Sequence, residues 1–267
     1  MRWMKAVGAC ALMVTVAACS TSPTGRSQML LLDEQQLSQM GAQAFDQYQQ
    51  ELPTVSGRQL EYVQCVTRNV VQALPEDQRN QNWQVKVFES EDANAFALPG
   101  GYVGVNTGLL DVATNQDQLA TVIGHEIGHV LAHHANERAS TESATQLGMS
   151  VVGTALGSQG VTGSDQLMAA MGMGAQYGIL LPFSRSHESE ADTIGLQLMA
   201  DAGFDPRASL ALWENMSAQG GARPPAWLSS HPSHGQRTQA LQARMDEALA
   251  RYQRARQAGR TPDCPRP

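Results

Sequence analysis

The feature that most constrains the fold of this sequence is the pentapeptide HEIGH at residues 125–129. Residues four apart on an α-helix lie on the same face, one turn above the other, so two histidines at this spacing can bind one metal ion. Apolar residues around the pentapeptide recur with a helical period, which predicts a helix over 117–136. We therefore expect a largely buried helix with a metal site in its middle.

The residue types in the pentapeptide also indicate a chemistry. His125 and His129 suit zinc, which in catalytic sites keeps one position open for water. Zinc lowers the pKa of this water to about 7, so hydroxide is available at neutral pH. Glu126 follows the first histidine, where its carboxylate can take the proton of the water and deliver it to a leaving amine. We expect one Zn²⁺ per chain, with Glu126 as the catalytic base.

Two other interpretations of the histidines stay open. One is a purely structural pair, His125 and His129, without catalysis. The other is a pair formed by His129 and His133, which are also four residues apart. No glutamate follows His129, so we prefer the first pair as ligands. His133 and His134 are interpreted as late helix residues that favour the negative end of the helix dipole.

A third protein ligand is expected from the acidic segment 187–192. Glu188 and Asp192 are four apart and share a helix face, whereas Glu190 points away from it. We expect Glu188 to bind the metal and Asp192 to accept the free N–H of a ligand histidine, which fixes the tautomer of the imidazole. Glu190 and, less readily, His187 are the alternatives for the third ligand.

A later loop carries His231 and Arg237. Both side chains can donate hydrogen bonds to the oxyanion that forms when hydroxide attacks a carbonyl group. His231 can instead occupy the open position of zinc in a resting form. A loop that only caps the next helix is the alternative interpretation.

Residues 1–18 are predicted to be a lipoprotein signal peptide. Arg2 and Lys5 precede an uncharged, mostly apolar run over 6–18, which is too short to span a bilayer. The run ends in Val-Ala-Ala-Cys, as in a bacterial lipobox, with Cys19 as the lipidated residue. No aspartate follows Cys19, and by analogy with other bacterial lipoproteins this favours a lipid anchor in the outer membrane, facing the periplasm. The alternative is an ordinary signal peptide with an incidental Cys19.

Export also bears on the remaining cysteines. Cys65 and Cys264 are the two that remain once the signal peptide and the lipidated residue are set aside. Lone thiols in an oxidising compartment commonly pair, so we expect a disulfide between them. Two unpaired thiols are the alternative.

Periodicity along the rest of the chain predicts an α+β fold that is mainly helical, with a small β-sheet. The expected helices cover 33–50, 57–74, 117–136, 188–202 and 236–256, and the expected strands cover 83–87, 94–98 and 102–106. We expect a flexible tether over 19–32, a single domain over 33–260 and a C-terminal tail over 261–267. The segment 143–184 lacks Lys and Arg and is expected to form a mobile lid or helical hairpin, with packed core helices as the alternative.

Composition limits the classes of function. The chain has 267 residues, of which 42% are hydrophobic, which suffices for a buried core and argues against disorder. The formal net charge is −7, and lysine and arginine are scattered, so nucleic acid is not an expected partner.

Taken together, the motifs resemble a known family. The pentapeptide at 125–129, the Glu188/Asp192 pair, the segment 94–101 and the loop ending at Arg237 occur in the order found in gluzincin metallopeptidases related to the CAAX prenyl protease and HtpX. The resemblance covers roughly residues 55–245. It is closest to the soluble periplasmic lipoprotein branch of the LoiP and BepA type.

The resemblance implies roles for individual residues. Its zinc ligands match His125, His129 and Glu188, and its base matches Glu126. His231 and Arg237 match residues linked to control of the active site or to transition-state binding. A strand at the sheet edge, bordering the active-site cleft, matches the substrate-aligning residues Asn94, Ala95, Phe96 and Ala97.

The resemblance further implies a zincin-type fold and a zinc-dependent endopeptidase. Its substrates would be misfolded or misassembled envelope proteins, as in protein quality control, and the outer-membrane assembly machinery would be a further partner. The alternative function is a chaperone-like or assembly-factor lipoprotein with a structural or latent zinc site.

Overall fold

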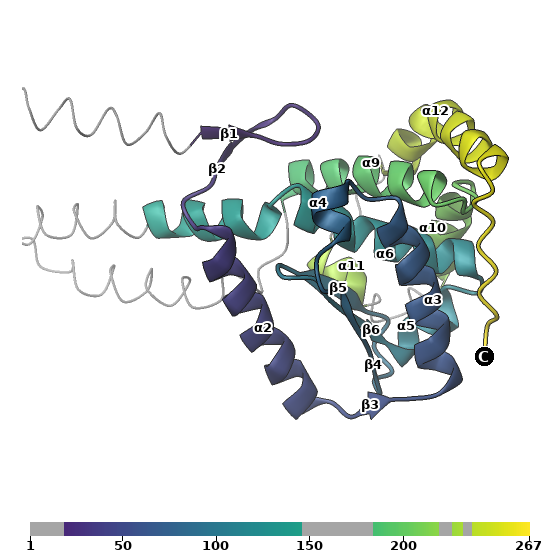
Figure 1. The fold of residues 1–267 in the computed structure, drawn as a ribbon, viewed down its shortest axis with the longest axis horizontal. Coiled ribbons are helices and arrows are strands. Elements are labelled where there is room, and N and C mark those ends of the chain that lie inside the picture. The colour runs from purple at the N-terminus through teal and green to yellow at the C-terminus, as the bar shows by residue number, and fades with distance from the viewer. Residues whose placement is uncertain (1–18, 146–183, 219–225, 232–236) are drawn as a thin grey trace, which may run out of the picture. The chain divides into compact units, whose positions relative to one another are not determined.

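The computed structural model describes residues 19–145, 184–218, 226–231 and 237–267 (Figure 1). The expected signal peptide at 1–18 and most of the expected lid at 143–184 lie outside the described residues. The described residues form two compact units. The smaller unit contains residues 19–33 and 133–145, and the larger unit contains the described residues of 34–132 and 184–267.

None of the described helices is both long enough and apolar enough to span a membrane.

A four-stranded sheet lies at the centre of the larger unit. Its strands, in the spatial order β3-β4-β6-β5, are β3 (Thr54–Val55), β4 (Gln84–Phe88), β6 (Tyr102–Asn106) and β5 (Ala95–Leu98). Strands β4 and β6 are parallel, and β5 pairs with β6 in the antiparallel direction. β5 is therefore an edge strand, as the sequence predicted.

Helices make up most of the remaining structure, which confirms the mainly helical α+β fold (Figure 1). The helices are α2 (Glu34–Glu51), α3 (Arg58–Gln72), α4 (Glu76–Arg79), α5 (Thr107–Val112), α6 (Gln116–Leu131), α9 (Arg185–Asp201), α10 (Ala208–Ala218), α11 (Ala226–Ser230) and α12 (Arg237–Gln257). Residues 134–145 of the smaller unit are also helical.

The two faces of the sheet bury different side chains because successive residues of a strand point to opposite faces. Val87, Val103 and Val105 join the apolar core that includes residues of α3 and α6. The aromatic rings of Phe88 and Phe96 lie within 6.3 Å of the Phe45 ring of α2. The sheet thus lies between α2 on one side and α3 and α6 on the other.

The register of β5 decides which of its backbone groups are available. The N–H of Asn106 donates to the carbonyl of Asn94 over 2.9 Å, and Ala95 lies opposite Val105. Hydrogen-bonded and non-hydrogen-bonded pairs alternate along an antiparallel ladder. Ala95 and Ala97 therefore direct their N–H and C=O groups away from β6, to the side that no described strand covers.

Helices α6 and α9 approach each other through glycines, and they run side by side in Figure 1. A β-carbon on Gly124 would lie 2.8 Å from the carbonyl oxygen of Gly195, and one on Gly128 would lie 3.0 Å from that of Ala191. The absence of side chains at these positions lets the two backbones touch. The helix with the HEIGH pentapeptide therefore lies directly against the helix with Glu188.

Helix α6 begins close to its predicted start but ends earlier than predicted. The side chain of Asn115 accepts a hydrogen bond from the N–H of Gln118 and caps the first turn. The helix ends at Leu131 rather than at residue 136, because His133 adopts a left-handed conformation with φ 52°. His133 and His134 are therefore not residues of its last turn, which corrects the sequence-based interpretation.

In the smaller unit, the segment expected to be a tether contains two short strands. Strands β1 (Cys19–Thr21) and β2 (Ser27–Met29) form an antiparallel pair. The Ser22 hydroxyl accepts a hydrogen bond from the N–H of Arg26, and the Arg26 guanidinium forms two hydrogen bonds to Glu137, at 2.6 and 2.5 Å. These contacts stabilise the β1–β2 hairpin.

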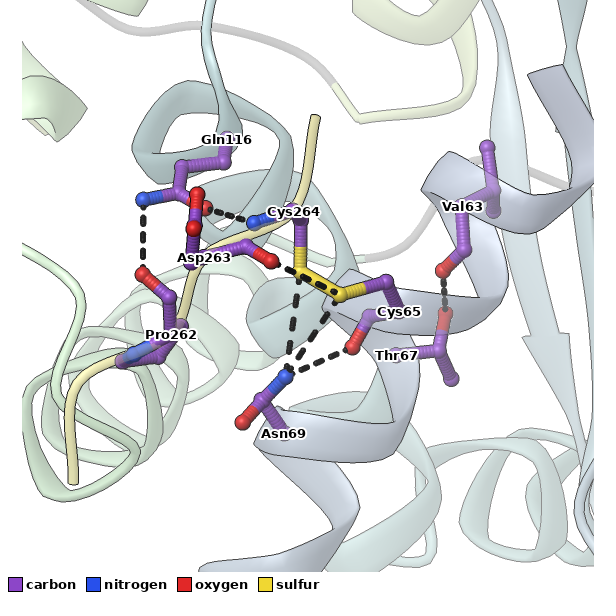
Figure 2. The surroundings of a disulfide bond; sticks show 8 residues. All are labelled: Val63, Cys65, Thr67, Asn69, Gln116, Pro262, Asp263 and Cys264. Carbon is purple, nitrogen blue, oxygen red and sulfur yellow. Dashed lines mark hydrogen bonds between the residues drawn. A yellow bond between two sulfur atoms is a disulfide. The ribbon is translucent and has the colours of Figure 1, made fainter. Parts of the chain in front are cut away.

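The C-terminal tail is fixed to the larger unit by a disulfide between Cys65 of α3 and Cys264, with an S–S distance of 2.02 Å (Figure 2). Gln116, the first residue of α6, donates to the carbonyl of Pro262 over 3.1 Å and accepts from the N–H of Cys264 over 2.8 Å. Arg260 also donates to the carbonyl of Asp201, the last residue of α9. The tail therefore contacts α3, the start of α6 and the end of α9.

Candidate metal centre

Four buried side chains of the larger unit bring their ligand atoms together. His125 and His129 come from α6, Glu188 comes from α9, and His231 follows α11. All four ligand atoms lie within 4.8 Å of one another. His125 Nε2 is 3.1 Å from His129 Nε2 and 3.3 Å from His231 Nδ1. Glu188 Oε1 is 3.0 Å from His231 Nδ1 and 3.4 Å from His129 Nε2.

These separations fit a metal ion. Donor atoms at about 2.0–2.1 Å from a tetrahedral zinc ion lie about 3.3 Å from one another. Glu188 Oε2 is buried as well and lies 3.0 Å from Arg237 Nη1 and 3.4 Å from His125 Nε2. The Arg237 guanidinium compensates part of the charge of this carboxylate, which a buried anion requires. The residues that the sequence pointed to thus form a set that can hold a metal.

Burial and close contacts shift the pKa values of three of the four ligand side chains. Burial lowers the pKa of His125, but hydrogen bonds with Asp192 and Glu188 outweigh it and raise this pKa to about 9. Burial holds the pKa of His129 well below its usual value. Burial raises the pKa of Glu188, but hydrogen bonds with the three histidines outweigh this effect and lower the pKa far below the usual range. Glu188 is therefore ionised, as a metal ligand must be.

Asp192 lies behind His125. Its Oδ1 is 3.0 Å from His125 Nδ1, the ring nitrogen that faces away from the cluster. An N–H donated to this carboxylate fixes the tautomer in which Nε2 is free to bind a metal. Burial raises the pKa of Asp192, but the neighbouring Arg237 and the hydrogen bond with His125 outweigh it and lower the pKa.

Arg237 contacts the carboxylates of Asp192 and Glu188. Its Nε and Nη2 lie 2.5 and 2.6 Å from the two oxygens of Asp192, and its Nη1 lies 3.0 Å from Glu188. Its Cζ lies 4.3 Å from the centre of the Trp213 ring. The guanidinium therefore links Asp192 and Glu188, both on α9, to the start of α12. The sequence pattern did not indicate that Arg237 contacts these two carboxylates.

Glu126 points to the same region and is 3% exposed. Its Oε1 accepts a hydrogen bond of 2.6 Å from the indole N–H of Trp227 and lies 3.4 Å from His231 Nε2. Sequence reasoning missed Trp227. The available signal was its position four residues before His231, which places both on the same side of a short helix.

The alternative ligands are not part of this cluster. Among the described residues, the set of His, Cys, Asp and Glu side chains able to hold a metal contains neither Glu190 nor His187. Both are buried, and both have interaction partners. His133 and His134 are likewise outside the cluster.

The predicted substrate-aligning residues form β5 and its first neighbour. Ala95, Phe96 and Ala97 lie in the edge strand, and Asn94 precedes it. The side-chain oxygen of Asn94 is buried and has no hydrogen-bond partner. The carbonyl of Ala93 accepts from the backbone N–H of Trp227 over 3.0 Å. The edge strand therefore begins next to the segment that carries Trp227 and His231.

Comparison with known proteins gives a consistent result. The model of peptidase family M48 matches residues 58–245, well over half of the chain. The mitochondrial metalloendopeptidase OMA1 of Bos taurus is 36% identical over 243 residues, covering 85% of this chain and 46% of that protein. The metalloprotease LoiP of Escherichia coli is 27% identical over 219 residues, covering 82% and 81%. The beta-barrel assembly-enhancing protease of Yersinia pestis is 34% identical over 153 residues, covering 55% and 31%. The chain spans about half the length of the OMA1 relatives that it matches.

Proposed function

The chain belongs to peptidase family M48, and from that premise we propose that it is a zinc-dependent endopeptidase. The observation that carries the proposal is the buried cluster of His125, His129, Glu188 and His231 beside the carboxylate of Glu126. Two histidines and a carboxylate from the protein are a common ligand set of catalytic zinc sites.

In the proposed mechanism, His125, His129 and Glu188 would hold the zinc ion. When bound, zinc lowers the pKa of water and polarises the carbonyl group of the scissile peptide. Glu126 takes a proton from the attacking water and delivers it to the nitrogen of the leaving amine. Asp192 holds His125 in the tautomer that binds metal. Arg237 holds Asp192 and Glu188 and is proposed as a positioning residue.

His231 is proposed to occupy the fourth position at rest. Its Nδ1 lies among the other ligand atoms, and its backbone N–H is held by the carbonyl of Trp227 over 2.8 Å. A substrate carbonyl needs an open position. We therefore expect His231 to leave the cluster when substrate binds, and basal activity to be low.

The proposed substrate is an extended segment of protein chain. The free backbone groups of Ala95 and Ala97 can pair with such a segment as an added strand, and the Asn94 side chain offers a further acceptor.

Misfolded or misassembled envelope proteins are the proposed source of this segment. This rests on the lipobox ending at Cys19, and on the names of two relatives, metalloprotease LoiP and beta-barrel assembly-enhancing protease. A lipid anchor in the outer membrane, facing the periplasm, and contact with its assembly machinery belong to the same proposal.

The experiment that tests the proposal compares the wild type with Glu126→Gln. Both proteins are expected to bind about one zinc ion per chain, and only the wild type is expected to cleave casein or an unfolded outer-membrane protein. Glu214→Gln serves as a matched control, because Glu214 is an exposed residue of α10. Absence of zinc from the wild type would contradict the ligand assignment.

A second function is favoured by one observation. Four protein ligands around one metal are typical of structural zinc sites, and His231 supplies a fourth ligand atom here. The protein would then act as a chaperone-like or assembly-factor lipoprotein with a structural or latent site. The same experiment separates the two functions, because zinc binding without cleavage by the wild type favours the second.

A further inference from the structure

We propose that Trp227 is the positioning residue of the catalytic base Glu126, an inference that rests on the proposed peptidase function. The Trp227 side chain is 1% exposed, and its indole N–H donates to Glu126 Oε1 over 2.6 Å. A buried indole N–H needs an acceptor, and a buried carboxylate needs donors. The contact satisfies both groups at once.

The direction of the indole N–H is fixed by its surroundings. The ring stacks on His231, with centroids 5.1 Å apart and an interplanar angle of 30°. It meets His125 edge to face at 5.2 Å and lies against Trp213 at 5.4 Å. The backbone N–H of Trp227 is bound to Ala93, at the start of the edge strand. The indole is thus oriented before it meets Glu126.

A fixed donor selects one orientation of the base. A glutamate side chain has three rotatable bonds, and a general base must lie within hydrogen-bond reach of the proton that it takes. Trp227 Nε1 donates to Oε1 of Glu126. The geometry therefore leaves Oε2 as the oxygen that receives the proton from water, and Trp227 acts by holding the carboxylate in that orientation.

The kinetic test removes the N–H and keeps an aromatic ring. Trp227→Phe is expected to lower kcat about 10- to 100-fold, because small misplacements of a reacting group have effects of this size. KM and zinc content are expected to stay within twofold of the wild type. The matched control is Trp83→Phe, which also removes a hydrogen-bonded indole N–H, here bound to the carbonyl of Gln78 over 3.0 Å. Trp83→Phe is expected to leave kcat unchanged.

A double variant distinguishes positioning of Glu126 by Trp227 from a merely structural role of Trp227. The shorter side chain of Glu126→Asp withdraws the carboxylate from the indole, so adding Trp227→Phe to this variant is expected to lower kcat by less than twofold further. Residues that act through one another show such non-additive effects. An equal fold loss in both backgrounds would overturn the proposal, as would an unchanged kcat of Trp227→Phe or a loss of zinc from it.

A spectroscopic readout does not depend on activity. In ¹H–¹⁵N spectra of the metal-free protein, Glu126→Gln is expected to shift the indole N–H resonance of Trp227 and to leave that of Trp83 in place. The Trp→Phe variants assign these resonances. An unmoved Trp227 resonance would overturn the proposal, whereas a wild type that binds zinc but cleaves nothing would contradict the proposed function instead.

Discussion

Gly195 packs so closely on α6 that a β-carbon at this position would lie 2.7 Å from the backbone nitrogen of His125. The atoms in the way belong to the backbone and cannot rotate aside. The distance between the two ligand-bearing helices is therefore set by a residue without a side chain. The ligand atoms of α6 and α9 meet because Gly195 brings their backbones into contact.

Gly195→Ala is expected to separate α6 from α9 and to weaken zinc binding at least tenfold, because a ligand shell tolerates only small displacements. The measurement is competition for zinc with a chelator of known affinity. Ser189→Ala is the control, since Ser189 is exposed on the same helix. A zinc affinity within twofold of the wild type would show that the helices accommodate the methyl group.

Arg237→Lys is expected to weaken zinc binding about 10- to 100-fold, because residues that orient metal ligands have effects of this size. A lysine keeps the charge but cannot reproduce the two-pronged contact with Asp192. Zinc affinity is again measured by competition with a chelator of known affinity. Arg244→Lys, which makes the same change elsewhere on α12, is the control. If zinc affinity is kept and only kcat falls, the oxyanion role expected from the sequence is the better explanation.

Ala97→Pro is expected to raise KM for a protein substrate about tenfold, because proline removes an N–H that faces the uncovered side of β5, and one hydrogen bond contributes about 1 kcal/mol. Proline is tolerated at a sheet edge, so the fold is expected to persist. Ala97→Ser keeps the N–H and is the control. Equal KM values for the two variants would argue against strand addition.

Replacing both Cys65 and Cys264 by serine is expected to lower the free energy of unfolding by about 2–4 kcal/mol, because the crosslink restricts the unfolded chain. The measurement is the urea midpoint at an unchanged m-value. A reductant is expected to destabilise the wild type and to leave the double variant unaffected. A wild type that does not respond to reductant would show that the bond does not contribute.

Much of the fold could be predicted from periodicity. Helix α3 and strand β4 follow directly from apolar residues at helical and alternating spacing. The early end of α6 could not be predicted, because the pattern does not reveal the left-handed conformation of His133. Gly124 and Gly195 were equally hidden, since a glycine within a helix indicates weak helix propensity rather than a contact with another helix.

The metal centre, like the fold, could be predicted only in part. The spacing of His125 and His129 and that of Glu188 and Asp192 indicated which side chains share a face, and the structure brings these four together. Spacing says nothing about groups far apart in the chain. The contact of Trp227 with Glu126 joins residues separated by 101 positions, and it depends on how α11 packs beside the edge strand.

The attachment of the C-terminal tail has a consequence for the order in which the molecule can be completed. Cys264 and Pro262, which hold Gln116 at the start of α6, follow every residue of the metal centre in the chain. A growing chain whose synthesis has reached residue 237 contains all four ligands, yet the first turn of α6 still lacks its last support. The centre is therefore fully supported only once residues 262–264 are in place, and zinc bound before that point would be held by a loosened helix.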